Sequence, residues 1–246
     1  MDISEKTLQL KQDFDDVYEA GKKSQYDEFW DNLQAYGNLG KYNYLFSYCR
    51  FHKDSFKPKY PLNIIDGAYA FAYQSKRHNP QAIGELITDL IQVCKDNNVV
   101  IDTSKATGLT GMFYASDYIT IPTISFEGMT AAINSIFYGN TQLETIEKLI
   151  FKADGSNTFA TNSWELPFSN CINLKNVVVE GVIGDSLSLA DCPLTEASIR
   201  SFVAALSSAS TGKTVTFKKT AKENAFTTDE WDALIKTKPN WTFSLV

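Results

Sequence analysis

Few side chains in this sequence have the types and spacing that chemistry requires. The 246 residues include two histidines, His52 and His78, and four cysteines that form no CxxC pair. The cysteines are Cys49, Cys94, Cys171 and Cys192. A zinc site needs closely spaced ligands, and a disulfide framework is typical of small secreted domains, so the sequence favours neither. We expect the cysteines to be buried structural residues.

Carboxylates are the remaining candidates for catalysis. Two acids that meet in the fold could hydrolyse a glycoside, and Asp117 with Glu144, or Glu144 with Glu147, would lie near strand edges. Nothing in the sequence separates these acids from ordinary surface acids. The segment STGKTV at 210–215 resembles the end of a phosphate-binding loop, but Ser207 stands where that motif has its first glycine. We therefore expect no enzyme, no catalytic residue and no cofactor, while metal binding by acids stays open.

The composition argues against several kinds of partner. The net charge is −6 and the pI is near 5.0, which disfavours a nucleic-acid partner. Residues 1–20 carry frequent charges and lack the apolar core of a signal peptide. No run of 18 apolar residues occurs, so we expect no membrane insertion. With 43% hydrophobic residues, the chain can form a large core.

A short pattern recurs along the chain. The segment MFYAS at 112–116 is matched by IFYGN at 136–140 and PFSNC at 167–171, with fainter copies at 70–74, 90–94 and 188–192. The second residue of each copy falls at 71, 91, 113, 137, 168 and 189, which gives intervals of 20, 22, 24, 31 and 21 residues. These intervals are near the period of leucine-rich repeats, with one insertion. The pattern therefore predicts stacked turns of a solenoid.

The fifth residue of each copy supports this alignment. These residues are Gln74, Cys94, Ser116, Asn140, Cys171 and Cys192. Small polar and thiol side chains at one repeated position can bond to backbone groups that would otherwise be unpaired in the interior. We predict that they point inward and are structural.

Each copy is followed by apolar residues that predict a strand. They are Ile119 and Ile124 in one turn, Leu143 and Ile146 in the next, and Leu174, Val177 and Val179 in the third. The third set is rich in β-branched residues and alternates. Stacked turns would pair these short strands in parallel.

The segment IDTSKATGLTGMFYASDYITIP at 101–122 resembles the repeat of the BspA-like leucine-rich-repeat family. The matching residues are Asp102, Thr103, Ser104, Met112, Phe113, Ser116 and Ile119. The blocks QYDEFWDNLQAYG and FKPKYPLN in front of the repeats, and the block from Lys213 to Val246 behind them, resemble sequences beside such repeats in bacteriophage tail and baseplate proteins and in surface proteins of gut bacteria. The resemblance implies an α/β leucine-rich-repeat solenoid with short parallel strands.

Both ends of such a solenoid need caps. We predict four parts: an N-terminal helix at 1–24, an aromatic cap at 25–62, the repeats at 63–206 and a β-α-β cap at 207–246. The heptad spacing of Ile3, Leu10 and Val17 could align three copies in a trimer, and a helix docked on its own domain is the alternative. The sequence also predicts an amphipathic helix at 194–210 and a helix that begins at Thr227 or Thr228.

The resemblance implies a non-catalytic recognition module in the virion, on a phage tail or baseplate. It would bind a bacterial surface glycan or protein and contact other tail or baseplate subunits. The alternatives are a fragment of a bacterial cell-surface adhesin, which would be extracellular, and a purely architectural virion protein.

Two sets of residues are candidates for the binding surface. Outward strand positions are Thr120, Thr123, Glu144, Glu147, Lys175 and Asn176. Aromatic anchors are Tyr114, Tyr118, Tyr138 and Trp164. Packing inside the core or between turns is the alternative role for these aromatic residues.

Overall fold

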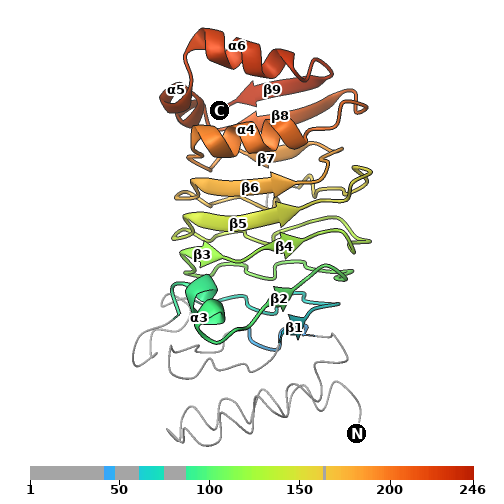
Figure 1. The fold of residues 1–246 in the computed structure, drawn as a ribbon, viewed down its shortest axis with the longest axis vertical. Coiled ribbons are helices and arrows are strands. Elements are labelled where there is room, and N and C mark those ends of the chain that lie inside the picture. The colour runs from blue at the N-terminus through green and yellow to red at the C-terminus, as the bar shows by residue number, and fades with distance from the viewer. Residues whose placement is uncertain (1–41, 48–60, 75–86, 163–164) are drawn as a thin grey trace, which may run out of the picture.

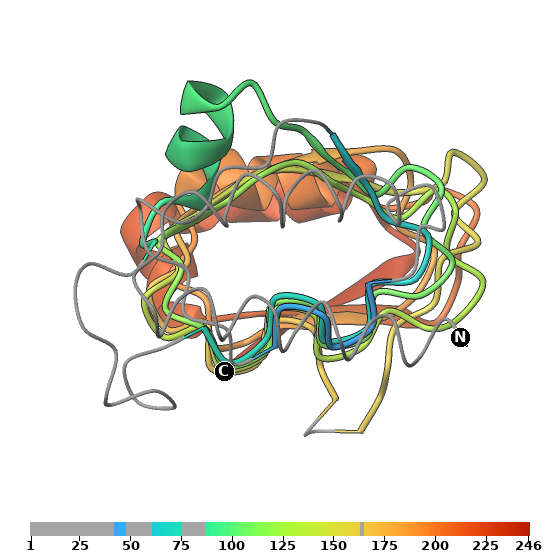
Figure 2. The ribbon, with the colours of Figure 1, turned by 90° about the horizontal axis from the view of Figure 1, so that it is seen from below.

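The computed structural model describes residues 42–47, 61–74, 87–162 and 165–246 (Figure 1). Within them the protein is a mixed α/β structure whose strands pair in parallel, with four helices and no closed barrel. The chain passes alternately along two opposite sides, and successive passages overlie one another when viewed down the long axis (Figure 2). We call one passage along both sides a turn. The predicted helix at 1–24 and most of the predicted cap at 25–62 lie outside the described residues.

One side of the turns, the strand side, carries two parallel sheets. The first pairs β1 (Leu62–Asn63) with β2 (Ile101–Asp102). In the second, β3 (Thr120–Ile121) and β4 (Ile124–Ser125) both pair with β5 (Thr145–Ile150), which pairs with β6 (Asn176–Glu180). The prediction of short parallel strands is confirmed here after the copies of the pattern at 112–116, 136–140 and 167–171.

Side chains alternate between core and surface in β3 and β6, whereas both residues of β4 are buried and β5 has a register shift between Ile146 and Leu149. Ile121, Ile146 and Val177 lie in register across β3, β5 and β6, and all three are buried. The prediction for Ile119 is wrong, because its side chain is 40% exposed and Ile121 fills the core instead. The strand begins one residue later than the apolar spacing indicates, which moves Ile119 to the outer side.

The opposite side, the phenylalanine side, is centred on one buried phenylalanine in each of five turns. Phe46, Phe71, Phe113, Phe137 and Phe168 stack in that order, with ring centroids 5.2, 5.7, 6.2 and 5.4 Å apart. This order confirms the alignment of residues 71, 113, 137 and 168. The predicted copy at 90–94 is wrong, because those residues belong to helix α3 (Leu90–Asp96) and Phe71 stacks directly on Phe113.

The backbone of the phenylalanine side repeats from turn to turn. The N–H of Phe71 donates to the carbonyl of Met112 at 2.8 Å, and that of Phe113 donates to Ile136 at 2.9 Å. Positive φ recurs two residues before and two residues after the phenylalanines, as at Gly111 (58°) and Ala115 (49°), with Leu166 before Phe168 as an exception. A Cβ at Gly111 would also lie only 2.5 Å from the Tyr69 ring, so this position requires glycine. Because the backbone bends at corresponding positions, neighbouring turns can stack closely.

The residue three positions after each of Phe71, Phe113, Phe137 and Phe168, and after Leu189 in the next turn, connects its turn to the previous one. Its side chain donates to the carbonyl oxygen of the preceding phenylalanine. The pairs are Gln74 to Phe46, Ser116 to Phe71 (3.1 Å), Asn140 to Phe113 (2.6 Å), Cys171 to Phe137 (3.1 Å) and Cys192 to Phe168 (3.8 Å). The predicted inward column is confirmed at these five positions. Cys94 is the exception, because it lies on α3.

Helix α4 (Glu196–Ala205) lies beside the last strand of the strand side (Figure 1). The hydroxyl oxygens of Ser198 and Ser201 accept hydrogen bonds from the N–H groups of Val177 and Val179, at 2.9 and 2.8 Å. The helix thus satisfies the open edge of β6 with side chains. The predicted amphipathic helix is confirmed, since its apolar face is buried.

The C-terminal part forms a third parallel sheet. Its strands are β7 (Leu187–Leu189), β8 (Lys213–Phe217) and β9 (Trp241–Leu245). Between β8 and β9 lie α5 (Lys219–Ala225) and α6 (Thr228–Lys236). The predicted order of strand, helix and strand is confirmed, although α5 was not predicted. The bond from Cys192 to Phe168 connects this sheet to the phenylalanine side.

Candidate functional site

The predicted outward strand residues do share one face. Thr120, Thr145 and Asn176 lie in register on β3, β5 and β6. The neighbouring row contains Glu144 and Lys175, joined by a backbone hydrogen bond from Lys175 N–H to Glu144 O at 3.0 Å. Their side chains are exposed or partly exposed. We call this surface the strand face; it also includes Thr123, Glu147 and Lys148.

Two ion pairs involve charged side chains of the strand face. Lys148 contacts Glu180 at 2.6 Å, and Lys95 of α3 contacts Glu147 at 3.6 Å. The Thr123 hydroxyl also lies 3.5 Å from a carboxylate oxygen of Glu147. Exposed pairs of this kind add little free energy and remain hydrated. The strand face therefore resembles an ordinary solvated surface.

The phenylalanine side has a different outer surface, which we call the tyrosine face. It consists of Tyr44, Tyr69, Tyr73, Tyr114 and Tyr138. The rings of Tyr44 and Tyr69 stack with centroids 5.1 Å apart and planes 8° from parallel. Those of Tyr114 and Tyr138 stack in the same way, at 5.1 Å and 7°. Tyr114 also meets Tyr69 at 5.9 Å and Tyr73 at 5.4 Å, both tilted, so the five rings form one connected surface over four turns.

The predicted aromatic anchors divide into two groups. Tyr114 and Tyr138 are partly exposed members of the tyrosine face. The prediction for Tyr118 is wrong, because its side chain is fully buried and meets Phe113 edge-on at 5.7 Å. Tyr118 therefore belongs to the core. Trp164 lies outside the described residues.

The tyrosine face lacks charged side chains. In the described residues of the five phenylalanine turns, the positions two before, one after and two after the phenylalanine hold only Tyr, Ser, Ala, Gly, Leu and Asn. Acidic side chains lie at the margin, where Asp66 accepts a hydrogen bond from the Asn43 amide at 2.8 Å. Burial, the neighbours Tyr44 and Tyr114, and the Glu165 carboxylate raise the pKa of Tyr69. Its hydroxyl therefore stays protonated at neutral pH.

Beyond Phe168 the same side continues as rows of hydroxyl groups. On β7, β8 and β9 the apolar residues Leu187, Val215 and Phe243 lie in register, and alternation turns their neighbours the other way. One row of neighbours is Ser186, Thr214 and Thr242, and the other is Ser188, Thr216 and Ser244. All six are partly or fully exposed. The hydroxyl-rich surface thus extends into the C-terminal sheet, and the Asp191 carboxylate, which accepts from Asn170 N–H at 2.7 Å, lies between it and the tyrosine face.

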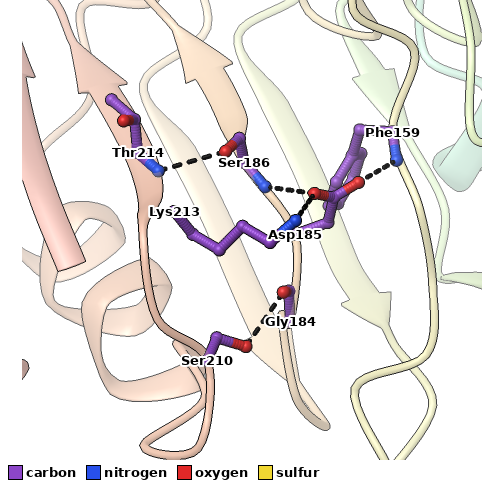
Figure 3. Close-up of polar contacts among 7 residues, drawn as sticks. All are labelled: Phe159, Gly184, Asp185, Ser186, Ser210, Lys213 and Thr214. Carbon is purple, nitrogen blue, oxygen red and sulfur yellow. Dashed lines mark hydrogen bonds and ion pairs between the residues drawn. The ribbon is translucent and has the colours of Figure 1, made fainter. Parts of the chain in front are cut away.

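A polar cluster around Asp185 joins this sheet to the preceding turns (Figure 3). One carboxylate oxygen accepts from Lys213 Nζ and from Ser186 N–H, each at 2.8 Å, and the other accepts from Phe159 N–H at 3.2 Å. Burial alone would raise the pKa of Asp185, but these donors outweigh it and lower the pKa. Both carboxylate oxygens have hydrogen-bond partners, which indicates that Asp185 has a structural role in connecting the sheet to the preceding turns.

Neither metal nor thiol chemistry finds support in the parts of the chain that are described. In them no three His, Cys, Asp or Glu side chains are grouped to hold a metal ion. Burial raises the pKa of the Cys94 thiol to about 12, and burial also raises the pKa of Cys171 and Cys192 above the ordinary value. Protonated, enclosed thiols are poor nucleophiles. The described helices also include none with the length and apolar character needed to cross a membrane.

Comparisons with protein-family models, with curated proteins and with solved structures give no match for this chain. The candidate site therefore rests on the geometry of the two faces.

Three members of the tyrosine face were missed by the sequence analysis. They are Tyr44, Tyr69 and Tyr73. The signal was present, because YLFSYC at 44–49 and YAFAYQ at 69–74 both place tyrosines two residues before and after a phenylalanine. Aligning the first of these segments with the repeats, rather than treating it as part of a cap, would have found the column.

Proposed function

We propose that this chain is a non-catalytic recognition module, built as a capped leucine-rich-repeat solenoid, that binds a bacterial surface through its tyrosine face. Its place would be a phage tail or baseplate, where other virion subunits contact it. The observation that carries the proposal is the connected, uncharged array of five tyrosine rings. A solenoid is supported by the repeated phenylalanine stack, the column of inward donors and the parallel strands.

The composition of the tyrosine face favours binding. Interface cores are depleted of charge and enriched in tyrosine, and binding loops of antibodies are rich in Tyr, Ser, Gly and Asn. Tyrosine offers a large contact area with few rotatable bonds, so ordering it costs little entropy. Here the rings are already held by one another, which reduces that cost further. The strand face carries exposed charges, among them Glu144, Glu147 and Lys175, and offers none of these advantages.

Cell binding by the full chain tests the proposal. A fluorescently labelled protein is incubated with a panel of gut bacterial strains and measured by flow cytometry. We expect saturable binding to some strains, at least tenfold weaker for a Tyr114→Ser, Tyr138→Ser double variant. The matched control is Glu144→Gln with Lys175→Gln on the strand face, which should bind as the parent does. Binding to no strain, or loss only in the control, would contradict the proposal and favour a purely architectural role.

The proposed assembly is a homotrimer. Three copies side by side would present three tyrosine faces, and linked sites gain effective affinity even when each site is weak. Light scattering of the full chain measures this directly. A monomer would leave the recognition role in place but remove multivalency from it.

A further inference from the structure

We infer that the tyrosine face binds an uncharged glycan chain that lies along the stack of turns, from Tyr44 towards Tyr138. This inference rests on the proposed recognition role and specifies its ligand. Three features of the tyrosine face lead to it: the absence of positive charge, the close packing of the rings, and the direction in which the rings follow one another.

Charge excludes acidic ligands. Phosphate, sulfate and carboxylate groups are bound by arginine, lysine or clustered N–H donors. The outward positions of the five phenylalanine turns hold no lysine or arginine in the described residues. The acids at the margin, Asp66 and Glu165, would repel an anion, and the whole chain has a net charge of −6. A neutral ligand meets none of this repulsion.

The close packing of the tyrosine rings argues against a protein partner. Protein interfaces concentrate binding energy where a large side chain enters a well-packed recess. The rings of Tyr44 and Tyr69, and those of Tyr114 and Tyr138, are stacked with centroids only 5.1 Å apart. That separation leaves no room for a side chain between the rings of a pair. A ligand must therefore lie across the array rather than insert into it.

A sugar chain suits such a surface. Its rings present apolar C–H patches that can pack on aromatic groups, and its hydroxyls can bond to side-chain hydroxyls and amides. The face supplies both kinds of partner, because the tyrosines are followed by the partly exposed Ser169, the exposed Asn170 and the hydroxyl rows of the C-terminal sheet.

The expected orientation of the glycan chain follows from the stacking of the turns. Neighbouring turns stack as strands do, about 4.7–4.9 Å apart, and the tyrosines follow this stacking direction through four turns. A linear polymer that runs along the stack would meet a new ring in successive turns. A short or strongly branched sugar would meet only one or two.

An array of immobilised polysaccharides tests the inference. The probes are neutral polymers (mannan, galactomannan, a β-glucan and purified neutral bacterial polysaccharides) and acidic ones (polygalacturonate, hyaluronan and teichoic acid). We expect the full chain to bind at least one neutral polymer, with an affinity that changes less than twofold between 50 and 500 mM salt. Binding only to acidic polymers, or to no polymer, would overturn the inference.

Variants locate the site. Tyr44→Ser is the cleanest change, because this side chain is 56% exposed and its loss should leave the fold intact. We expect it to weaken binding about three- to tenfold, and Tyr114→Ser with Tyr138→Ser to weaken it more than tenfold. Tyr138→Phe keeps the ring and should lose less than Tyr138→Ser. The strand-face control, Glu144→Gln with Lys175→Gln, should bind normally, and equal loss in that control would also overturn the inference.

Treated cells separate this inference from the proposed function. If periodate treatment of the bacteria abolishes binding and protease treatment does not, the ligand is a glycan, as inferred. If protease abolishes binding and periodate does not, recognition stands but the ligand is a protein and the inference fails. If the untreated cells are not bound, the proposed function itself fails.

Discussion

The Asn140 side-chain amide nitrogen donates to two carbonyl oxygens in adjacent turns, that of Phe113 at 2.6 Å and that of Phe137 at 2.8 Å. Asn140 is completely buried. One side chain therefore satisfies two backbone groups that no strand partner reaches. The same column holds glutamine, serine and cysteine in other turns, so the shared requirement is a donor at this depth rather than one residue type.

Replacing Asn140 tests that requirement. Asn140→Ala leaves the Phe113 carbonyl without its side-chain donor, while the Phe137 carbonyl keeps its bond from the Asn140 backbone N–H at 3.2 Å. We expect a cost of about 1–3 kcal/mol in the free energy of unfolding. Asn140→Ser keeps a donor, as Ser116 does one turn earlier, and should cost less. Urea denaturation measures both, with Asn224→Ala on the exposed side of α5 as the control. Equal costs for the alanine and serine variants would show that the donor is unimportant.

Cys171 should tolerate a small polar substitute but no charge. Cys171→Ser retains a donor towards Phe137, whereas Cys171→Arg would bury a charge and overpack a filled interior. We expect the serine variant to melt within a few degrees of the parent and the arginine variant to be unfolded. Circular dichroism follows both. Ser169→Arg, two residues away on the partly exposed outer side, should remain folded, and normal melting of Cys171→Arg would contradict the repeat alignment.

The serines of α4 should stabilise the edge of the strand side. Ser198→Ala leaves the buried Val177 N–H without its acceptor, and we expect a loss of about 1–3 kcal/mol. Ser201→Ala does the same for Val179, which is less deeply buried, and should cost about 1 kcal/mol. Thermal melting gives both values, with the exposed Ser208→Ala as the control. An unchanged melting temperature for Ser198→Ala would mean that water replaces the hydroxyl.

The Asp185 cluster gives stability a pH dependence. The pKa of Asp185 is lowered in the folded protein, so its contribution is present above the ordinary value of 3.8 and is lost as pH falls through the folded pKa. At pH 7, Asp185→Asn should destabilise the protein by about 1–2 kcal/mol. The difference between variant and parent should shrink below about pH 4. Urea curves at several pH values measure it, with Asp232→Asn on the exposed side of α6 as the reference; a gap that does not change with pH would refute the ionic role.

The start of α6 depends on one of two adjacent threonines. The Thr227 hydroxyl accepts from Glu230 N–H at 3.3 Å, and the Glu230 carboxylate accepts from Thr227 N–H at 2.9 Å. Thr227→Ala should therefore cost about 1 kcal/mol. Thr228→Ala lies inside the helix and is the matched control, with an expected cost near zero. If Thr228→Ala lowers the melting temperature more than Thr227→Ala does, the helix is capped by Thr228 instead.

Periodicity in the sequence was enough to predict the inward column, the parallel strands and the C-terminal order of strand, helix and strand. It failed at Leu90–Cys94, where the apolar spacing matches the repeat but Asp89 caps a helix by accepting from Gln92 N–H. It also failed at Tyr118, because the residue type alone does not show that this ring packs edge-on against Phe113 inside the core. Contacts across the tyrosine face could not be derived at all. Tyr69 and Tyr114 meet because Phe71 and Phe113, 42 positions apart in the sequence, stack on one another, and the sequence does not show this.

On the phenylalanine side, the backbone bonds of Phe71, Phe113 and Phe137 reach only the next turn along the chain. A complete turn could therefore be duplicated or deleted without disturbing more than its two neighbours. Each such event would change the length of the molecule by about one strand spacing, roughly 4.7–4.9 Å, and would add or remove one row of the outer surface. The length of the protein and the number of turns that contribute to its outer surface can therefore change one turn at a time during evolution, while the two ends stay the same.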